Sequence, residues 1–242
     1  MAVRPKRAMV LSGGLGLRMR PLTLTKPKPL VLLAGKPLLD HVLDRLGAAG
    51  IETAVVNVHY LPDQIEQHVK DRTAPKVVIS DERGGLLDTG GGILKALDKL
   101  GPDPFFICNA DSFSVPASAS SFARLADSFD FECMDSLMLL ATAANAIGYE
   151  GHGDFFMSPE GVLKRRRERE IAPFAFTGTS IAHPRLFRDA PQGPFSLNQL
   201  WDRAIAEGRL HGLRQDGQWM HVGSPSALQY AEQMLASGEL YF

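Results

Sequence analysis

The sequence predicts an α/β protein with one doubly wound, mostly parallel sheet. Short apolar runs alternate with amphipathic helical patterns over the first two-thirds of the chain. Runs that are buried on both faces and separated by helices are typical of parallel sheets with right-handed crossovers. A glycine-rich turn at 12–16 follows directly on the first apolar run. The chain has 242 residues, 45% of them hydrophobic, which is enough to bury one sizeable core.

Apolar periodicity and end signals place the elements of the first half. Pro37–Gly50 is expected to form a helix, because a proline begins it, its apolar residues share one face and Gly50 can cap its end. Thr53–Val58 is rich in β-branched residues, so a strand is expected there. The expected strands of this half are 8–11, 53–58, 76–80 and 105–109, and the expected helices are 37–50, 62–69 and 93–100.

The pattern changes from residue 137 onward, where short strands and turns replace the alternation. Ser196 is expected to cap one helix, and Ser224-Pro225 to begin a final helix that runs to about Ser237. The later strands are expected to build a small β-rich lid over a second substrate. The expected strands are 137–141, 154–157, 162–165, 174–181, 209–214 and 219–222, and the first of the two helices is 197–207.

The glycine-rich turn Ser12-Gly13-Gly14-Leu15-Gly16 directly follows the apolar run 8–11. Glycines let backbone N–H groups approach and cradle phosphate oxygens, because they lack a Cβ and accept positive φ. Arg18 and Lys28 add two cations within reach of the same turn. The spacing matches neither G-x-G-x-x-G nor the Walker pattern. Together these residues predict a polyphosphate site and chemistry on a nucleoside triphosphate.

Asp111 follows the apolar strand expected at 105–109, within Asn109-Ala110-Asp111. Because ligands of open α/β sheets bind at the carboxyl ends of the strands, Asp111 and the glycine-rich turn are expected at the same edge. A carboxylate there is suited to hold Mg²⁺ against substrate phosphates. The alternative interpretation is a turn or helix-capping aspartate.

The whole N-terminal string resembles the loop of the sugar-1-phosphate nucleotidyltransferases, with GGLGLRMRPLT…KPKPL here and roughly GGxGTRLxPLT…PKPL in the family. The resemblance implies that Arg18 steadies the departing pyrophosphate and that Lys28 contacts the reacting phosphates. Leu17 stands where the family has threonine, so one side-chain contact to phosphate is in question. The nucleotide contacts implied for this region are Leu11, Ser12, Gly13, Gly14, Gly16 and Asn109.

Trp219-Met220-His221-Val222-Gly223-Ser224-Pro225 resembles the family's W-x-D-x-G-T-P, with His221 in place of the aspartate that completes the metal site. The resemblance implies Mg²⁺ as cofactor and Asp111 as its ligand. Three interpretations stay open for His221, which are a metal ligand, a contact to phosphate or water, and a structural residue. Imidazole is a softer ligand than the carboxylate that Mg²⁺ prefers.

The loop 82–92, ERGGLLDTGGG, resembles the family's base and ribose loop, which implies nucleotide contacts at Glu82 and Gly90. The alternative is a flexible loop that leads into a helix. For the sugar, the resemblance implies contacts at Gly153, Glu168 and Thr177. The charged run 163–170 is either a solvated strand edge or a basic wall that meets an anionic sugar phosphate.

The resemblance implies a Rossmann-like nucleotide-diphospho-sugar transferase fold in a single domain, 1–242. Its nucleotide-binding half would cover about 1–115 and its sugar-binding half about 116–242. LLDTGGGI, PFSLNQLWDRAI and WMHVGSP look most like the N-acetylmuramate-1-phosphate uridylyltransferase subfamily of peptidoglycan recycling. The implied substrates are UTP, or another nucleoside triphosphate, and a sugar 1-phosphate. The alternatives are a mannose-1-phosphate guanylyltransferase and a non-catalytic nucleotide-sugar-binding regulatory protein.

The composition of the chain limits the classes of binding partner and the compartment that we expect. A net charge of −1 gives no reason to expect nucleic acid or an anionic membrane as partner. No apolar run approaches the roughly 18 residues of a membrane-spanning helix, and the run after the basic start is too short for a signal peptide. Cys108 and Cys133 lack metal or disulfide spacing, so the cytoplasm is the expected compartment. A monomer or small homo-oligomer is expected.

Overall fold

The computed structural model describes residues 4–115 and 120–238, and its central sheet follows the order β10-β9-β11-β6-β1-β4-β5. Strands β6, β1, β4 and β5 are parallel, and β11 joins them antiparallel to β6. β8 pairs with both β11 and β12, which extends the sheet away from the parallel part. The strands are β1 (Arg7–Leu11), β4 (Thr53–Val58), β5 (Lys76–Asp81), β6 (Phe105–Asn109), β8 (Ser136–Thr142), β9 (Phe155–Met157), β10 (Leu163–Arg165), β11 (Phe174–Ala182) and β12 (Leu210–Arg214).

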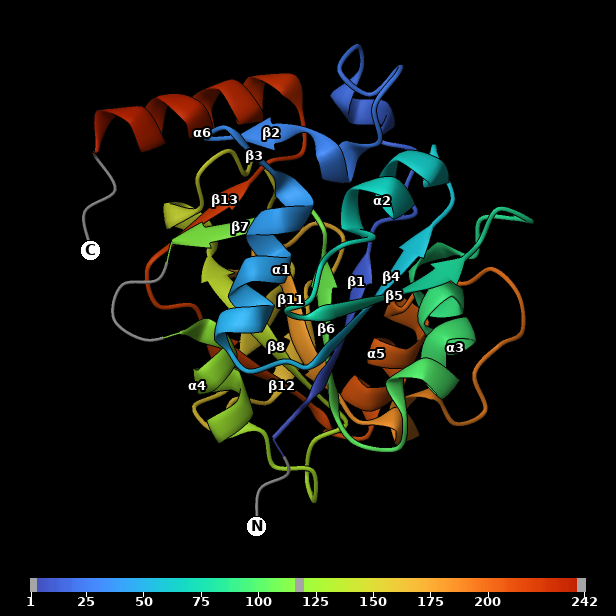
Figure 1. Ribbon diagram of the computed structural model, residues 1–242. Helices are drawn as coiled ribbons and strands as arrows, with labels where there is room; N and C mark the ends of the chain where they lie inside the picture. Colours follow the sequence, from blue (N-terminus) through green and yellow to red (C-terminus); the bar gives the residue numbers. More distant parts are fainter. Residues whose placement is uncertain (1–3, 116–119, 239–242) are drawn as a thin grey trace.

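Helices cover both faces of the parallel strands, which confirms the predicted doubly wound architecture (Figure 1). Ala8 and Val10 of β1 pack into the core that holds α1 and α4, whereas Met9 packs into the core that holds α3 and α5. The alternation along β1 therefore serves two cores, as expected for a strand buried on both faces. The helices are α1 (Leu38–Ala48), α2 (Pro62–Val69), α3 (Asp88–Leu100), α4 (Ser121–Ser128), α5 (Asn198–Ala206) and α6 (Pro225–Ser237).

A smaller β layer lies next to α6. β7 (Ser112–Val115) pairs antiparallel with β13 (Gln218–His221), and β2 (Leu32–Leu33) pairs with β3 (Lys36–Pro37). α6 packs beside β2, where the Ala34 N–H donates to Glu232 Oε1 at 2.8 Å. Four short 3₁₀ turns complete the described secondary structure, at Leu17–Met19 (η1), Lys28–Leu30 (η2), Ala143–Asn145 (η3) and Pro184–Phe187 (η4).

The predicted strands are confirmed to within one or two residues at their ends, but the sequence-based assignment missed the short strands β2 and β3, the four 3₁₀ turns and two longer elements. One is β7, whose four residues pair only with a distant strand. The other is α4, although Phe122, Leu125 and Ala126 carry the i, i+3, i+4 apolar spacing of a helix and are buried.

The helix expected at 93–100 begins five residues earlier, at Asp88. Its first turn contains Gly90, Gly91 and Gly92, which have low intrinsic helix propensity. Main-chain N–H groups of Gly90 and Gly91 donate to the Phe195 carbonyl, so a long-range contact holds this turn. The Ser224 cap of α6 is confirmed, since its hydroxyl accepts the Ala227 N–H at 3.2 Å.

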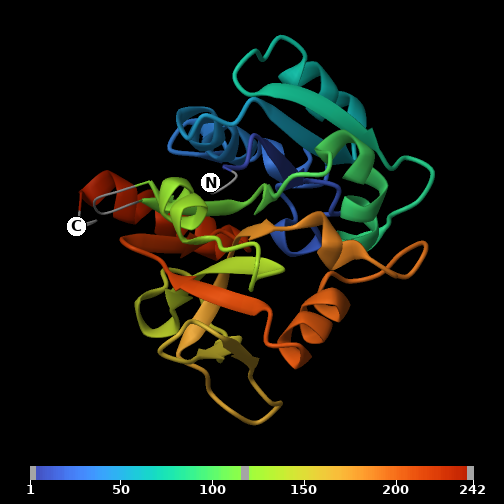
Figure 2. The same ribbon diagram turned by 90° about the horizontal axis from the view of Figure 1, so that it is seen from below.

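The two halves of the chain share one sheet, because β11 hydrogen-bonds to β6. In Figure 2 the blue-to-teal part of the chain lies on one side of the molecule and the yellow-to-orange part on the other. The predicted boundary near 115/116 adjoins residues 116–119, which lie outside the described residues. The division into a nucleotide half and a sugar half stays a prediction.

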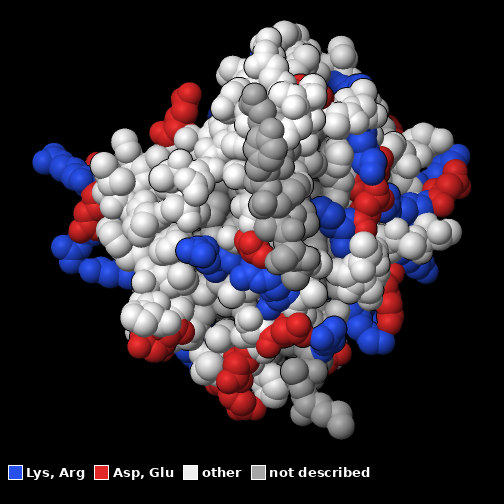
Figure 3. Space-filling view, turned by 90° about the vertical axis from the view of Figure 1, so that its left-hand side faces the viewer, with Lys and Arg blue, Asp and Glu red and all other residues white. Residues whose placement is uncertain are grey.

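Among residues 4–115 and 120–238, no helix is both long enough and apolar enough to cross a membrane. On the face that Figure 3 shows, basic and acidic side chains lie interspersed.

Candidate active site

A cavity of about 570 Å³ opens at the carboxyl ends of β1, β4 and β6. This is the edge at which open α/β sheets bind their ligands. The 3₁₀ turns η1 and η2 and the first turn of α3 complete its walls. The residues predicted from the sequence that line it are Leu11, Ser12, Gly13, Gly14, Gly16, Arg18, Lys28, Glu82, Asn109 and Asp111.

The glycine-rich loop keeps its backbone open to the cavity. Gly16 is left-handed, with φ +64°, and the Thr23 hydroxyl donates to its carbonyl at 2.7 Å. A Cβ on Gly16 would lie 3.1 Å from the Thr23 methyl group, so both conformation and space require glycine there. Gly14 has no atom within 4 Å of where its Cβ would stand. The loop can therefore bring its N–H groups against an anion.

Lys28 and Asp111 meet inside the cavity. The Lys28 ammonium lies 2.5 Å from Asp111 Oδ2, and both side chains are mostly shielded from solvent. Lys28 comes from η2, and Asp111 follows β6, where the Ala110 N–H donates to the Leu11 carbonyl at 3.0 Å. That bond fixes the turn of Asp111 beside the start of the glycine-rich loop. The pair thus offers one cation and one carboxylate at the same point.

His221 lies at the end of β13, where it is paired with Ser112, the residue after Asp111. Burial lowers the pKa of His221, and the cations Lys28 and Arg18 lower it further, while Asp111 acts in the opposite direction. The imidazole is therefore neutral near pH 7, the form that can bind a metal ion. A Cβ on Gly223 would lie 2.4 Å from His221 Nε2, so glycine leaves the space that the ring occupies.

Asp111 and His221 fit a Mg²⁺ ion whose other ligands would come from substrate phosphates and water. Within the described ranges, no group of three His, Cys, Asp or Glu side chains could by itself enclose a metal ion. Mg²⁺ is commonly held by one or two carboxylates together with substrate phosphates and water. Asp111, with His221 opposite the next residue, Ser112, and in the wall of the adjoining cavity, matches that pattern.

A buried polar network that the sequence analysis missed forms the floor of the cavity. The Ser12 N–H donates to Asn57 Oδ1 at 2.8 Å, and Asn57 Nδ2 donates to Glu82 Oε1 at 2.9 Å. All three residues are at least 95% buried and line the cavity. An asparagine inside the apolar strand β4 is the sequence signal that points to it.

Burial raises the pKa of Glu82, and hydrogen bonds from Asn57 and the Leu87 main chain act in the opposite direction. Glu82 Oε2 is buried and has no hydrogen-bond partner among the described residues. This oxygen is the polar atom of the cavity floor that is left for a ligand to satisfy.

Gly90 lies behind the cavity wall. A Cβ there would stand 2.2 Å from the Phe195 ring, and Gly90 itself does not line the cavity. Its neighbours Asp88 and Thr89 do, and Asp88 holds a left-handed conformation with φ +59°. Residues 88–92 thus form the start of α3, braced by Phe195, while residues 82–87 form a loop that leads into this helix.

The three predicted sugar contacts line neither this cavity nor the cavity of about 620 Å³ that adjoins it. Thr177 is buried, and its hydroxyl donates to the Leu139 carbonyl at 2.9 Å. Gly153 has φ +74°, and a Cβ there would clash with the Ala172 carbonyl at 2.1 Å. Glu168 is exposed, and its carbonyl accepts from Arg166 at 3.0 Å.

The basic run beside Glu168 is largely engaged within the protein. Arg165 pairs with Asp202 at 2.5 Å and lies over the Phe155 ring. Arg166 donates to the carbonyls of Gly153, Arg167, Glu168 and Glu170. For these two arginines the structure favours the strand-edge interpretation over a basic wall.

A second cavity of about 620 Å³ adjoins the first, and Arg18 and Gly223 line both. Its other walls come from the loop that includes Tyr149 and from the start of α6. The shared residues place the two cavities side by side.

Comparison with known proteins defines the class. Residues 7–149 match the family described as nucleotidyl transferase. The chain belongs to this family, among its sugar-1-phosphate nucleotidyltransferases, as the sequence motifs predicted.

Two similar relatives cover almost the whole chain. The N-acetylmuramate alpha-1-phosphate uridylyltransferase of Caulobacter vibrioides is 48% identical, over 98% of this chain and 99% of its own length. The enzyme of the same name from Neisseria meningitidis is 34% identical, over 93% of this chain and 96% of its own. A mannose-1-phosphate guanylyltransferase catalytic subunit beta from Drosophila pseudoobscura is 28% identical, over 90% of this chain but 59% of its own.

Solved structures confirm the fold. A UDP-glucose pyrophosphorylase in complex with UDP-glucose superposes with a TM-score of 0.77, at 18% identity, over 97% of this chain and 99% of its own. An inositol-1-phosphate CTP transferase from T. maritima superposes with a TM-score of 0.78, at 17% identity, over the full length of both chains.

Proposed function

We propose that this protein transfers a uridylyl group from UTP to N-acetylmuramate 1-phosphate, forming UDP-N-acetylmuramate and pyrophosphate in peptidoglycan recycling. The observation that carries the proposal is the cavity in which the glycine-rich loop, Arg18 and the Lys28–Asp111 pair converge. The near full-length similarity to two N-acetylmuramate alpha-1-phosphate uridylyltransferases supports the choice of both substrates.

The proposed reaction is a direct displacement at phosphorus. An oxygen of the sugar phosphate attacks the α-phosphorus of UTP, and the bond to the β-phosphate oxygen breaks to release pyrophosphate. The attacking oxygen is already ionised, so no general base is needed, and positioning with charge neutralisation supplies the catalysis. Lys28 would neutralise the α-phosphate and the incoming sugar phosphate, while Arg18 and the N–H groups of 12–16 would hold the leaving pyrophosphate.

We propose Mg²⁺ as the cofactor, held by Asp111 and by His221 together with phosphate oxygens and water. When bound, a divalent ion supplies Lewis-acid charge neutralisation on the phosphates. Lys28 would keep Asp111 Oδ2 in place, which leaves Oδ1 for the ion. The neutral imidazole of His221 supplies a lone pair in place of the family's carboxylate.

The remaining contacts of the proposal divide between nucleotide and sugar. Leu11, Gly13 and Asn109 would contact the nucleotide from the strand ends, and Glu82 would face the base, with Gly90 acting through the packing of α3. For the sugar, Glu168 offers an exposed carboxylate, while Gly153 and Thr177, whose carbonyls already accept from Arg166 and Ser112, would act indirectly by holding the backbone around the sugar.

We further propose a cytoplasmic protein. Cys108 and Cys133 are both free, and burial raises the pKa of the Cys108 thiol to about 12, which makes it unreactive. Free thiols are typical of reducing compartments.

The test is pyrophosphate release with Mg²⁺, for UTP, dTTP, GTP, CTP and ATP, each against N-acetylmuramate, N-acetylglucosamine, glucose and mannose 1-phosphates. Release confined to UTP with N-acetylmuramate 1-phosphate is the expected result. Preference for GTP with mannose 1-phosphate would establish the guanylyltransferase, which the similarity over 90% of the chain keeps as second candidate. Nucleotide binding without any release of pyrophosphate would establish the non-catalytic regulatory protein. This alternative is kept because His221 stands in place of the family's metal-binding aspartate.

A further inference from the structure

We propose that Asn57 is a positioning residue that sets the phosphate loop, and that Glu82 fixes the orientation of its amide and so couples the two ends of the cavity. The proposal deepens the proposed function and rests on it for the identity of the nucleotide. Neither Asn57 nor this coupling follows from the motifs of the phosphate loop, since β4 carries none of them.

Asn57 holds the first residue of the glycine-rich loop at two points. Its side-chain Oδ1 accepts the Ser12 N–H at 2.8 Å, and its main-chain carbonyl accepts the Ser12 hydroxyl. Both residues are nearly fully buried, so water cannot replace either bond. The loop therefore leaves β1 in a direction that the neighbouring strand β4 dictates.

Two partners orient the amide of Asn57, because the Ser12 N–H requires an acceptor on one side and Glu82 Oε1 requires a donor on the other. Asn57 Nδ2 donates to Glu82 Oε1 at 2.9 Å, and a carboxylate oxygen on that side requires the NH₂ group there. Oδ1 is thereby turned toward Ser12. Glu82, which the resemblance implies to be a nucleotide contact, thus helps to hold Oδ1 toward the first residue of the glycine-rich loop.

The space around this pair is kept free by glycines of the two loops that it joins. A Cβ on Gly13 would lie 3.0 Å from Asn57 Nδ2, and one on Gly92 would lie 2.7 Å from Glu82 Oε1. Gly13 belongs to the phosphate loop and Gly92 to the first turn of α3. Asn57 and Glu82 therefore lie between the glycine-rich loop and the start of α3, and we propose that they set the relative position of these two elements.

The expected signature is a loss of affinity that depends on the number of phosphates. Asn57→Ala removes the acceptor of the Ser12 N–H, so the contacts of the loop to the β- and γ-phosphates loosen while those to the nucleoside remain. We expect UTP to bind about tenfold more weakly and UMP to change by less than about threefold, as for the loss of one buried hydrogen bond.

The experiment measures the dissociation constants of UMP, UDP and UTP by calorimetry, with Mg²⁺, on the full chain. Ser136→Ala is the matched control, because Ser136 is fully buried and donates to the Ile181 carbonyl at 2.8 Å, away from the cavity. Thermal unfolding measures how much stability each variant loses with its buried hydrogen bond. The control thereby separates this general loss from an effect on nucleotide binding. A UMP-to-UTP ratio of dissociation constants that stays at the wild-type value in Asn57→Ala would overturn the proposal.

A second pair of variants tests the amide orientation even if Asn57→Ala does not fold. Glu82→Gln keeps an acceptor for Asn57 Nδ2 and should preserve the UMP-to-UTP ratio, whereas Glu82→Leu removes it and should lower the ratio about tenfold. Equal ratios in both variants would refute the coupling. If wild type prefers another nucleotide, the proposed function fails, and the same ratio is measured with the mono- and triphosphate of that base.

Discussion

Lys28 and Asp111 are 83 residues apart in sequence, yet their charged groups lie 2.5 Å apart in the cavity. Lys28 comes from η2 and Asp111 follows the end of β6. The glycine-rich loop lines the same cavity. At the residue scale the proposed function therefore depends on a few charged side chains that would act on phosphate. Two predictions test them individually.

Lys28→Ala removes the cation proposed to neutralise the reacting phosphates. Loss of one such group costs about 10²–10³-fold in turnover, so pyrophosphate release should fall by that factor. The fold should persist, because Asp111 stays partly solvated when its partner is lost. Steady-state kinetics and a thermal unfolding curve check both parts, and turnover close to wild type would remove Lys28 from the mechanism.

His221→Asp replaces a neutral imidazole by the carboxylate that hard cations prefer. If position 221 holds the ion, the Mg²⁺ concentration that gives half-maximal activity should fall severalfold. The measurement is a Mg²⁺ titration of pyrophosphate release at saturating UTP, with His221→Ala as the variant without a ligand. An unchanged Mg²⁺ requirement in both variants would show that position 221 is not a ligand.

At the element scale, the first turn of α3 is held by a segment more than 100 residues away. Leu197 N–H donates to the Thr89 hydroxyl at 2.9 Å, and Phe195 packs on the surface that Gly90 leaves bare. This segment lies just before α5. The start of α3 is thus positioned by the second half of the chain, which explains why this helix begins earlier than its own propensity predicts.

Gly90→Ala tests this packing. The new Cβ would meet the Phe195 ring at 2.2 Å, and such overpacking costs about 1–3 kcal/mol of unfolding free energy. We expect that loss in urea denaturation, together with a raised KM for UTP as the loop shifts. Gly85→Ala is the matched control in the same loop, since nothing lies within 4 Å of its Cβ position. Equal stability of the two variants would contradict the expected steric role.

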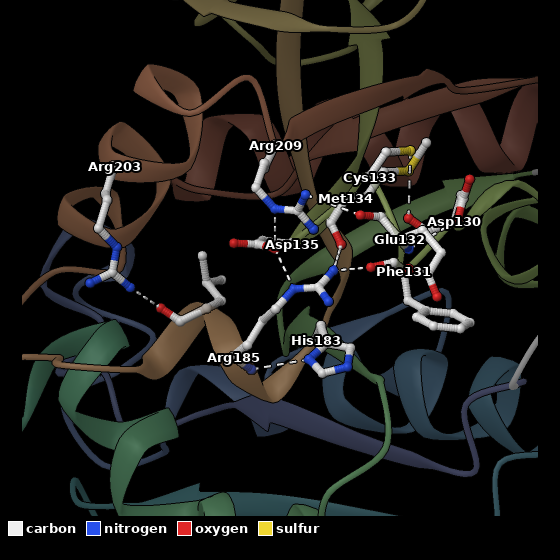
Figure 4. Close-up of polar contacts among 11 residues, drawn as sticks. Asp130, Phe131, Glu132, Cys133, Met134, Asp135, His183, Arg185, Arg203 and Arg209 are labelled. Atoms are coloured by element: carbon white, nitrogen blue, oxygen red, sulfur yellow. Dashed lines mark hydrogen bonds and ion pairs between the residues drawn. The ribbon is translucent and has the colours of Figure 1, made fainter.

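At the scale of the whole molecule, a cluster of ion pairs ties the second half together at the edge of the sheet opposite the cavity (Figure 4). Asp135 Oδ1 accepts from Arg185 at 2.5 Å and from Arg209 at 2.7 Å. The two arginines also donate to main-chain carbonyls of the turn 131–134. This single carboxylate thus joins the start of β8 to η4 and to the residue before β12.

Asp135→Asn should therefore destabilise the protein by about 3 kcal/mol at pH 7, because it leaves two arginines without their charge partner. Burial opposes ionisation of Asp135, but the two guanidinium groups outweigh it and hold the pKa below its ordinary value. The ionised carboxyl then stabilises the fold above the unfolded pKa of about 3.9, and this stability is lost as the pH falls through the lower folded value.

Urea denaturation at pH 7 and at pH 2 to 4 measures that dependence. The difference between wild type and Asp135→Asn should shrink as the pH falls. A difference that stays constant over this range would mean that the charge of Asp135 does not contribute to stability.

The sequence by itself determined the sheet, most of its helices and the place of the glycine-rich loop, since these depend on local periodicity and on glycines next to a strand. It also placed Arg18, Lys28 and Asp111 at the cavity, because strand ends in a parallel sheet share one edge. Only the tertiary structure decided that Asn57 supports the loop and that Phe195 braces α3. These contacts join residues 45 or more positions apart, and no local pattern encodes which distant partner a buried polar group or a bare glycine will meet.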